Sequence, residues 1–442
     1  MKTYNLLVFM VPVIFTAMSG CGRQKDAKMA QLPERPNIVI IFIDDMGYGD
    51  LGCYGSETIR TPNIDKMASE GTRFTDFYVQ PVCGPSRAAL LTGRYPFRNG
   101  GWRMHENEIT FAEILKTQGY STGCIGKWDC SNRRYIPGLV PNDQGFDSYW
   151  GPLGANDRDV VYLWDNRDSI GAERNMAGLT ATYTDKAISF IEDNSEGPFL
   201  LYLAHTMVHV VVDASADFRG KSKNGLYGDA VEELDFHTGR LIDRIDELGL
   251  GKNTLVLFTS DNGPWSNDID RQRKKNKGAM AWGTSGPLRG AKATTWEGGV
   301  RVPCIARWPG YIPAGRTNKA IFSSIDLLPS FASLAGSQAP SDRVIDGVDQ
   351  TALLTGANEQ GNRDHLYYFC QDYLHAVRSD NWKLMLADRK GYRDWINDRG
   401  TDGIELYDLG TDIGETRNIA GSHPEVVEEL LLLAGQISGY KE

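Results

Sequence analysis

The stretch Ile38-Val39-Ile40-Ile41-Phe42-Ile43, followed at once by Asp44-Asp45, is the part of the sequence that says most about the fold. A continuous apolar run of this length is typical of a strand buried on both faces of a parallel sheet. Four further segments are predicted strands: residues 120–125, 199–203, 254–259 and 304–308. The sequence therefore predicts a sheet that contains several fully buried strands.

Helical patterns separate these strands. The clearest covers residues 229–248, where Val231, Leu234, Leu241 and Ile245 share one face and charged residues occupy the other. Further predicted helices are residues 111–118, 182–193 and 326–335. Strands and helices in alternation predict an α/β fold, with a large, mainly parallel or mixed central sheet flanked by helices.

The pattern changes after about residue 340. Four short strand-like pieces follow, at residues 366–369, 374–378, 382–386 and 405–409, and a predicted helix at residues 424–437 ends the chain. We expect a smaller C-terminal α+β subdomain over residues 341–442, built from an antiparallel sheet and one helix. The larger α/β domain then covers residues 36–340.

Residues 1–22 are predicted to be a signal peptide and are left out of the fold. Lys2 precedes an apolar run that is too short to span a bilayer. Met18-Ser19-Gly20-Cys21 resembles a bacterial lipobox, and the alternative is simple secretion after cleavage nearby. Residues 23–35 are polar and are interpreted as a tether. We expect an exported protein in the periplasm, or at the outer membrane or cell surface as a lipoprotein.

Charge and cysteine content narrow the functional classes. The formal net charge of −10 argues against a nucleic-acid partner, and an anionic substrate would need a locally positive pocket. Apart from Cys21 and Cys83, five cysteines remain, so at least one thiol is unpaired within the chain. A Cys124–Cys130 disulfide and two independent buried thiols both fit the spacing. None of the cysteines has zinc-site spacing.

Carboxylates stand where two of the predicted strands end. Asp44 and Asp45 follow one strand, and Asp261 and Asn262 follow another. The carboxyl ends of parallel strands share one edge of a sheet, so these side chains can meet. Such an all-oxygen set suits Ca²⁺ or Mg²⁺. Taken singly, each pair is better explained as turn chemistry, but the two pairs together with Cys83 favour a metal site.

The second chemical motif is Cys83-Gly84-Pro85-Ser86-Arg87, which runs into a predicted helix. A helix N-terminus offers free N–H groups that favour an anion, and Arg87 adds a permanent positive charge. Lys127 and Lys292 can bind the oxygens of an anionic group, although most lysines are surface residues. His209 is the preferred proton donor, and His205 is the weaker candidate.

The motif Cys83 to Arg87 resembles the signature of type I sulfatases, which are members of the alkaline phosphatase superfamily. In that family the cysteine is oxidised to formylglycine by a formylglycine-generating or anaerobic maturase enzyme, and the hydrated aldehyde is the nucleophile. Further blocks of the family resemble segments of this chain at residues 36–55, 61–65, 227–263, 288–303, 326–336 and 405–409. The resemblance implies that Asp44, Asp45, Asp261 and Asn262 bind Ca²⁺ together with residue 83. It makes residues 36–340 the catalytic domain.

The resemblance also implies a reaction. The hydrate attacks sulfur with Asp261 accepting its proton, while Ca²⁺, Arg87, Lys127 and Lys292 stabilise the sulfuryl oxygens and His209 protonates the leaving oxygen. One position departs from the family, which usually reads Gly-Lys-Trp-His where this chain reads Gly126-Lys127-Trp128-Asp129. Asp129 is interpreted as a replacement base in a variant sulfatase, and the alternative is a damaged site.

The predicted substrate is a sulfated polysaccharide or oligosaccharide. The basic run at residues 271–277 either borders the pocket or forms a solvated loop. Candidate sugar contacts are Trp102, Arg103, Trp164 and Arg167, with Asp129 beside the substrate. Two alternatives are a phosphonate or phosphodiester hydrolase of the same superfamily, and a catalytically dead glycan-binding homologue.

Overall fold

A computed structural model of the chain describes Met1 and residues 32–266, 268–276, 278–279, 281–387, 403–437 and 440. The predicted signal peptide, the lipobox and residues 23–31 of the tether lie outside the described residues. Leu32–Glu442 form one compact unit. Within the described ranges, no helix has the length and apolarity needed to cross a membrane.

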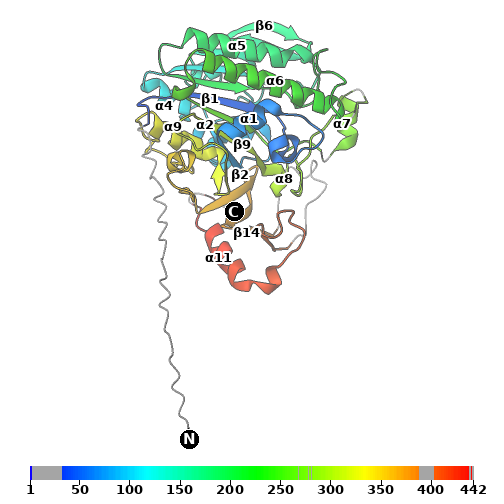
Figure 1. Ribbon diagram of the computed structural model, residues 1–442, viewed down its shortest axis with the longest axis vertical. Coiled ribbons are helices and arrows are strands. Elements are labelled where there is room, and N and C mark those ends of the chain that lie inside the picture. The colour runs from blue at the N-terminus through cyan, green and yellow to red at the C-terminus, as the bar shows by residue number, and fades with distance from the viewer. Residues whose placement is uncertain are drawn as a thin grey trace. The chain divides into compact units, whose positions relative to one another are not determined.

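A mixed sheet of eleven strands forms the centre of this unit (Figure 1). The strand order is β10-β2-β9-β8-β1-β7-β3-β4-β5-β6, and β11 pairs with β2. The strands are β1 (Asn37–Ile43), β2 (Thr72–Tyr78), β3 (Ser121–Gly126), β4 (Ser148–Pro152), β5 (Val161–Asp165), β6 (Asp168–Glu173), β7 (Phe199–Ala204), β8 (Thr254–Ser260), β9 (Arg301–Arg307), β10 (Arg316–Asn318) and β11 (Phe322–Ser323). Strands β8, β1, β7, β3 and β4 are mutually parallel, which confirms the predicted fold class.

Strand β1 is the central strand predicted from the apolar run. All seven of its residues are buried, and it pairs with β7 on one side and β8 on the other. Because side chains alternate along a strand, Ile38, Ile40 and Phe42 join one core cluster, while Val39 and Ile41 join the opposite one. Burial on both faces explains why the run carries no polar residue until it ends at Asp44.

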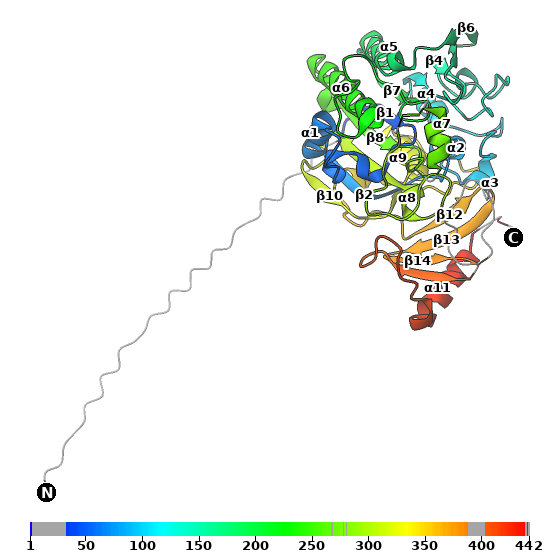
Figure 2. The ribbon, with the colours of Figure 1, turned by 90° about the vertical axis from the view of Figure 1, so that its right-hand side faces the viewer.

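Helices cover both faces of the sheet, as Figure 2 shows. Apolar side chains of α2 (Cys83–Thr92), α4 (Phe111–Thr117) and α9 (Leu327–Leu334) belong to one core cluster. Those of α1 (Pro62–Glu70), α5 (Leu179–Asp193) and α6 (Gly225–Glu247) belong to the other. The predicted helices at 111–118, 182–193, 229–248 and 326–335 are therefore confirmed. Three short helices complete this part: α3 (Pro96–Asn99), α7 (Ile269–Lys275) and α8 (Glu297–Val300).

Six strands of the sheet were not predicted: β2, β4, β5, β6, β10 and β11. Strand β2 alternates buried and half-buried residues, and β6 is exposed along nearly its whole length. An edge strand of that kind buries no apolar face, so it leaves no hydrophobic period in the sequence. The open question about Cys124 and Cys130 is also answered, because both are buried free thiols.

The C-terminal part is a four-stranded antiparallel sheet of β12 (His365–Cys370), β13 (Tyr373–Ser379), β14 (Trp382–Met385) and β15 (Glu405–Asp408). The short helix α10 (Thr351–Leu354) precedes it, and α11 (Pro424–Ala434) packs on it. This confirms the predicted antiparallel sheet and helix.

Buried charges join this sheet to the larger one. The Lys383 Nζ of β14 lies 2.9 Å from Glu297 Oε1 at the start of α8 and 2.7 Å from Glu415 Oε1. All three side chains are fully buried, so none can lose its partner without leaving an uncompensated charge. The network fixes the segment that precedes α8, and that segment carries Lys292.

Candidate active site

The candidate residues converge at the carboxyl edge of the parallel strands. Asp44 and Asp45 follow β1, Asp261 and Asn262 follow β8, Lys127 follows β3, and His209 lies beyond β7. Cys83 is the first residue of α2, and Lys292 comes from the segment before α8. Each of these side chains is buried. The structure therefore brings together residues that are up to 248 positions apart.

Cys83 stands at the entry to α2, whose N-cap is Val82. The next residue, Gly84, permits a close approach, because a Cβ on it would lie 2.3 Å from Cε3 of Trp102. The Sγ atom of Cys83 lies 3.9 Å from Lys292 Nζ and 3.9 Å from Arg133 Nη2. Burial raises the pKa of the Cys83 thiol to about 12, although Lys127 and Lys292 act in the opposite direction.

Four oxygen-bearing side chains form an acidic cluster: Asp44, Asp45, Asp261 and Asn262. The Asn262 amide donates to Asp45 Oδ1 at 2.7 Å, and the Asp45 backbone N–H donates to Asp261 Oδ1 at 3.1 Å. Ligand atoms of Asp44, Cys83 and Asp261 lie within 4.8 Å of one another. Three buried oxygens have no hydrogen-bond partner: Asp44 Oδ1, Asp45 Oδ2 and Asn262 Oδ1. Buried oxygens without donors are what a hard cation would satisfy, so the cluster fits a metal site.

Buried cations surround this cluster. Lys127 Nζ lies 2.8 Å from Asp44 Oδ2, and Lys292 Nζ lies 2.5 Å from Asp45 Oδ1. Burial alone would raise the pKa of Asp44, but the Lys127 ammonium and neighbouring cations hold it below its ordinary value. The pKa of Asp261 rises to about 7, because burial and the charge of Asp44 outweigh the effect of Arg87.

Arg87 lies beneath the carboxylates and is wholly buried. Its Nη2 and Nε donate to Asp261 Oδ2 at 2.7 and 3.1 Å. Its Nη1 donates to the Lys127 carbonyl at 3.1 Å. The guanidinium is therefore engaged with the protein and orients Asp261.

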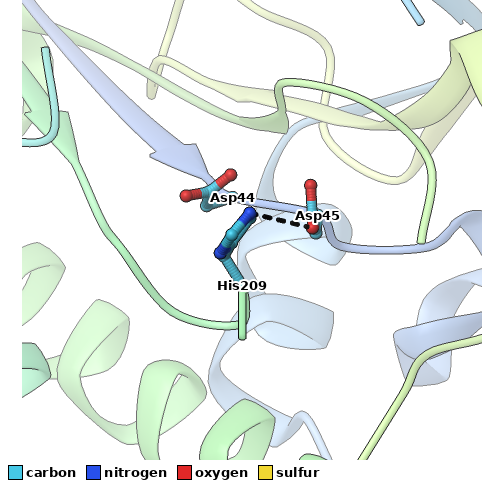
Figure 3. A group of neighbouring side chains, drawn as sticks. All are labelled: Asp44, Asp45 and His209. Atoms are coloured by element: carbon cyan, nitrogen blue, oxygen red, sulfur yellow. Dashed lines mark ion pairs between the residues drawn. The ribbon is translucent and has the colours of Figure 1, made fainter. Parts of the chain in front are cut away.

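His209 faces the acidic cluster, as Figure 3 shows with Asp44 and Asp45. Its Nε2 lies 3.8 Å from Asp45 Oδ2, and its Nδ1 lies 2.6 Å from the Val210 carbonyl. A carbonyl can only accept, so Nδ1 carries a proton and Nε2 points toward the site. Burial and the Lys292 charge lower the pKa of His209. His205 is buried against Tyr183, where burial lowers its pKa to about 3, so it belongs to the core.

Asp129 belongs to a series of ion pairs that was not predicted from the sequence. Its Oδ2 lies 3.2 Å from Lys127 Nζ, and its Oδ1 accepts from Arg133 Nε at 2.9 Å. Arg133 Nη1 donates in turn to Asp157 Oδ2 at 2.6 Å. Burial alone would raise the pKa of Asp129, but Lys127 and Arg133 hold it below its ordinary value. Arg133 and Asp157 were missed, since only the four-residue spacing from Asp129 to Arg133 hints at a pair.

The remaining candidates lie farther out. Arg103 is more than half exposed and pairs with Glu106 at 3.5 Å, while Arg167 pairs with Asp143 at 2.5 Å. Trp102 packs on Gly84 and lies under the Arg133 guanidinium, 5.3 Å from its centre. The basic run forms α7, and Lys275 Nζ lies 3.1 Å from Asp157 Oδ1 at the border of the site. Lys277 lies outside the described residues.

Comparison with known proteins agrees with this geometry. The family model described as Sulfatase matches residues 36–337, and one described as N-sulphoglucosamine sulphohydrolase, C-terminal, matches residues 291–433. Human steryl-sulfatase is 35% identical over 435 residues, covering 78% of this chain and 74% of its own. Mouse N-acetylgalactosamine-6-sulfatase is 36% identical over 436 residues, covering 90% and 79%.

A solved structure from work on the metabolism of multiple glycosaminoglycans by Bacteroides thetaiotaomicron has a TM-score of 0.82 and 28% identity. The structural match covers 92% of the present chain and 99% of the chain in the solved structure. The two family models together span residues 36–433, which include both sheets and every segment that supplies the site. The chain therefore belongs to the sulfatase family of hydrolases.

Proposed function

We propose that this enzyme removes sulfate from a sulfated glycan, R–O–SO₃⁻ plus water giving R–OH and sulfate. The observation that carries the proposal is the acidic cluster with unpaired oxygens, set directly beside Cys83 and enclosed by Arg87, Lys127, Lys292 and Arg133. Two relatives support a carbohydrate substrate by their names, one for N-acetylgalactosamine 6-sulfate and one for glycosaminoglycan metabolism. Steryl-sulfatase has a different named substrate, so family membership alone does not decide the class.

Residue 83 is proposed to act as formylglycine. A thiol with a pKa of about 12 stays protonated near neutral pH and is a poor nucleophile. Converted to formylglycine, residue 83 supplies a hydrated aldehyde whose hydroxyl can attack sulfur. Asp261 is the proposed acceptor of that proton, and Arg87 fixes its orientation.

The acidic cluster is proposed to hold Ca²⁺ through Asp44, Asp45, Asp261 and Asn262. When bound, the ion supplies Lewis-acid stabilisation of sulfuryl oxygen charge. Lys127 and Lys292 provide fixed ammonium groups beside the same position, and the site excludes water because all of these side chains are buried. The protein thus presents positive charge where negative charge develops.

Replacing His209 with Gln should affect substrates with poor leaving groups most. A sugar alkoxide needs a proton as it leaves, whereas 4-nitrophenolate does not. We expect kcat on a sulfated sugar to fall about 100-fold, and kcat on 4-nitrophenyl sulfate to change only a few-fold. Steady-state rates on both substrates measure this. His205→Gln is the matched control for losing a buried imidazole, and equal losses on both substrates by His209→Gln would reject His209 as the acid.

Asp129 is expected to act chiefly by holding Arg133 at the reacting position. Asp129→Asn keeps the side-chain shape and suits the positive φ of 59° at this residue. We expect Asp129→Asn and Arg133→Ala each to lower kcat/KM about tenfold, and the double variant to lose little more. Asp185→Asn, which breaks the exposed pair with Arg240, should leave turnover unchanged. Additive losses would instead favour Asp129 as an independent base.

The proposed function is tested by screening the purified, matured enzyme against sulfated mono- and oligosaccharides, with sulfate release as the readout. Release from at least one sulfated glycan is expected. Phosphate or phosphonate ester hydrolysis without sulfate release would support the superfamily alternative. Correctly matured protein that binds sulfated glycans without turnover would support the glycan-binding alternative. We further propose that the enzyme is exported, which globomycin-sensitive processing at Cys21 or extracellular accumulation would test.

A further inference from the structure

A pocket of about 690 Å³ lies beside the active site and shares only Arg133 and Asp157 with the site described above. Its walls come from the loop after β3 and from the β4–β5 hairpin. The charged and aromatic lining residues are Arg133, Arg134, Tyr135, Asp157, Arg158, Tyr162 and Trp164. Its size is typical of a small-molecule site.

Two residues connect the pocket to the reacting position. Arg133 lines the pocket, yet its Nη2 lies 3.9 Å from Cys83 Sγ. Asp157 also lines the pocket, and its Oδ1 lies 4.0 Å from His209 Nε2. A molecule whose sulfate sits beside residue 83 and whose leaving oxygen faces His209 would therefore extend past this pair into the pocket.

The lining is suited to sugars. The rings of Tyr135 and Trp164 stack at 4.8 Å with an interplanar angle of 18°. Tyr162, two residues earlier on β5, is 63% exposed and also lines the pocket. Aromatic faces with one polar end pack against pyranose rings while their hydroxyl or indole groups stay hydrated.

The pocket lining also carries positive charge that protein carboxylates do not fully neutralise. Arg133 is neutralised by Asp129 and Asp157, but Arg134 and Arg158 have no carboxylate partner anywhere in the described part of the chain. Both are exposed at the pocket. A guanidinium that lacks a protein carboxylate and lines a cavity is placed to bind a ligand carboxylate or sulfate through paired N–H donors.

We propose that this pocket binds a second anionic group of the glycan, carried by the sugar next to the one that is desulfated. The preferred substrates are then oligosaccharides with at least two anionic groups, contacted by Arg134 and Arg158 through the second. The inference rests on the proposed function, because that function fixes where the first sulfate lies.

Competition against 4-nitrophenyl sulfate hydrolysis tests the pocket separately from the reaction. The probes are sucrose octasulfate for sulfate groups, trigalacturonate for carboxylates, and inorganic sulfate for the reacting position alone. We expect at least one disaccharide- or trisaccharide-sized polyanion to inhibit at a concentration tenfold or more below that of inorganic sulfate. Arg134→Gln/Arg158→Gln should raise that polyanion's Ki about tenfold more than the Ki of sulfate.

A charge-matched control separates local binding from long-range attraction. Arg174 and Lys221 are exposed and do not line the pocket, so Arg174→Gln/Lys221→Gln removes the same charge elsewhere. This variant should leave every Ki and the basal turnover unchanged. An equal polyanion Ki in wild type and Arg134→Gln/Arg158→Gln, with 4-nitrophenyl sulfate still hydrolysed, would overturn the pocket assignment alone. Absence of any sulfate ester hydrolysis would instead reject the proposed function.

Discussion

Replacing Cys83 with Ala is expected to abolish sulfate release, with kcat falling by at least about 10³-fold. Alanine cannot be converted to an aldehyde, so the remaining cations could bind the sulfate group but nothing would attack the sulfur. Cys83→Ser should be equally inactive, because an unmodified serine side chain is an alcohol and not an aldehyde hydrate. Sulfate release from a sulfated glycan under saturating substrate measures both variants.

The control for losing a buried thiol is Cys370→Ala. Cys370 is wholly buried in β12, far along the chain from the site, and should be replaceable without loss of turnover. Mass spectrometry of the wild-type peptide that contains residue 83 should show the thiol side chain converted to an aldehyde, that is, sulfur replaced by oxygen together with the loss of two hydrogens. Substantial turnover by Cys83→Ala, or an active enzyme in which Cys83 is an unmodified thiol, would contradict the proposed nucleophile.

Asp45→Asn is expected to remove both Ca²⁺ binding and activity. Asparagine keeps the shape and accepts the positive φ of 63° at this position, so the backbone can stay as it is. The change removes one of three clustered carboxylates, the one that lies 2.5 Å from Lys292 Nζ. We expect kcat/KM to fall at least about 100-fold, since metal stabilisation of the sulfuryl oxygens is lost.

Thermal unfolding gives a second readout that does not depend on turnover. An ion that binds only the folded state at about 100 times its Kd stabilises the protein by about 2.7 kcal/mol. The wild-type Tm should therefore rise with Ca²⁺ and fall with EGTA, while that of Asp45→Asn should not respond. Asp380→Asn makes the same chemical change at another positive-φ residue, in the turn between β13 and β14, and should keep the response. A full Ca²⁺ response in Asp45→Asn would contradict the assigned ligand set.

The buried elements of the fold could be predicted because their buried positions carry apolar residues, and that pattern can be recognised in the sequence. Strand β1 packs on both faces, so positions 38 to 43 are all apolar, and the run ends where the chain reaches the acidic cluster. Strand β6 has no such constraint, and its exposed residues carry no period. The same reasoning explains why α5 and α6 could be predicted from the sequence and the β5–β6 hairpin could not.

The candidate site was predictable for residues that follow buried strands and carry a recognisable motif. Asp44, Asp261 and Lys127 are of this kind. Arg133 and Asp157 are not, because their positions depend on loops whose course is set by tertiary contacts, including the positive φ of 60° at Arg133. The interpretation of Asp129 likewise changed. In the sequence it is a single departure from the family motif, whereas in the structure it forms ion pairs with both Lys127 and Arg133.

The burial of Cys83 sets an order of events during synthesis. Only 1% of this residue is exposed, Lys292 and Arg133 each lie 3.9 Å from its sulfur, and Trp102 packs on the next residue, Gly84. Under the proposed function, a modifying enzyme must take this side chain into its own active site, so it needs this segment before α2 has packed against the sheet. Under the proposed function, maturation therefore competes with folding, and each molecule that folds first is permanently inactive. The active fraction of a preparation would then report which of the two processes was faster in the cell that made it.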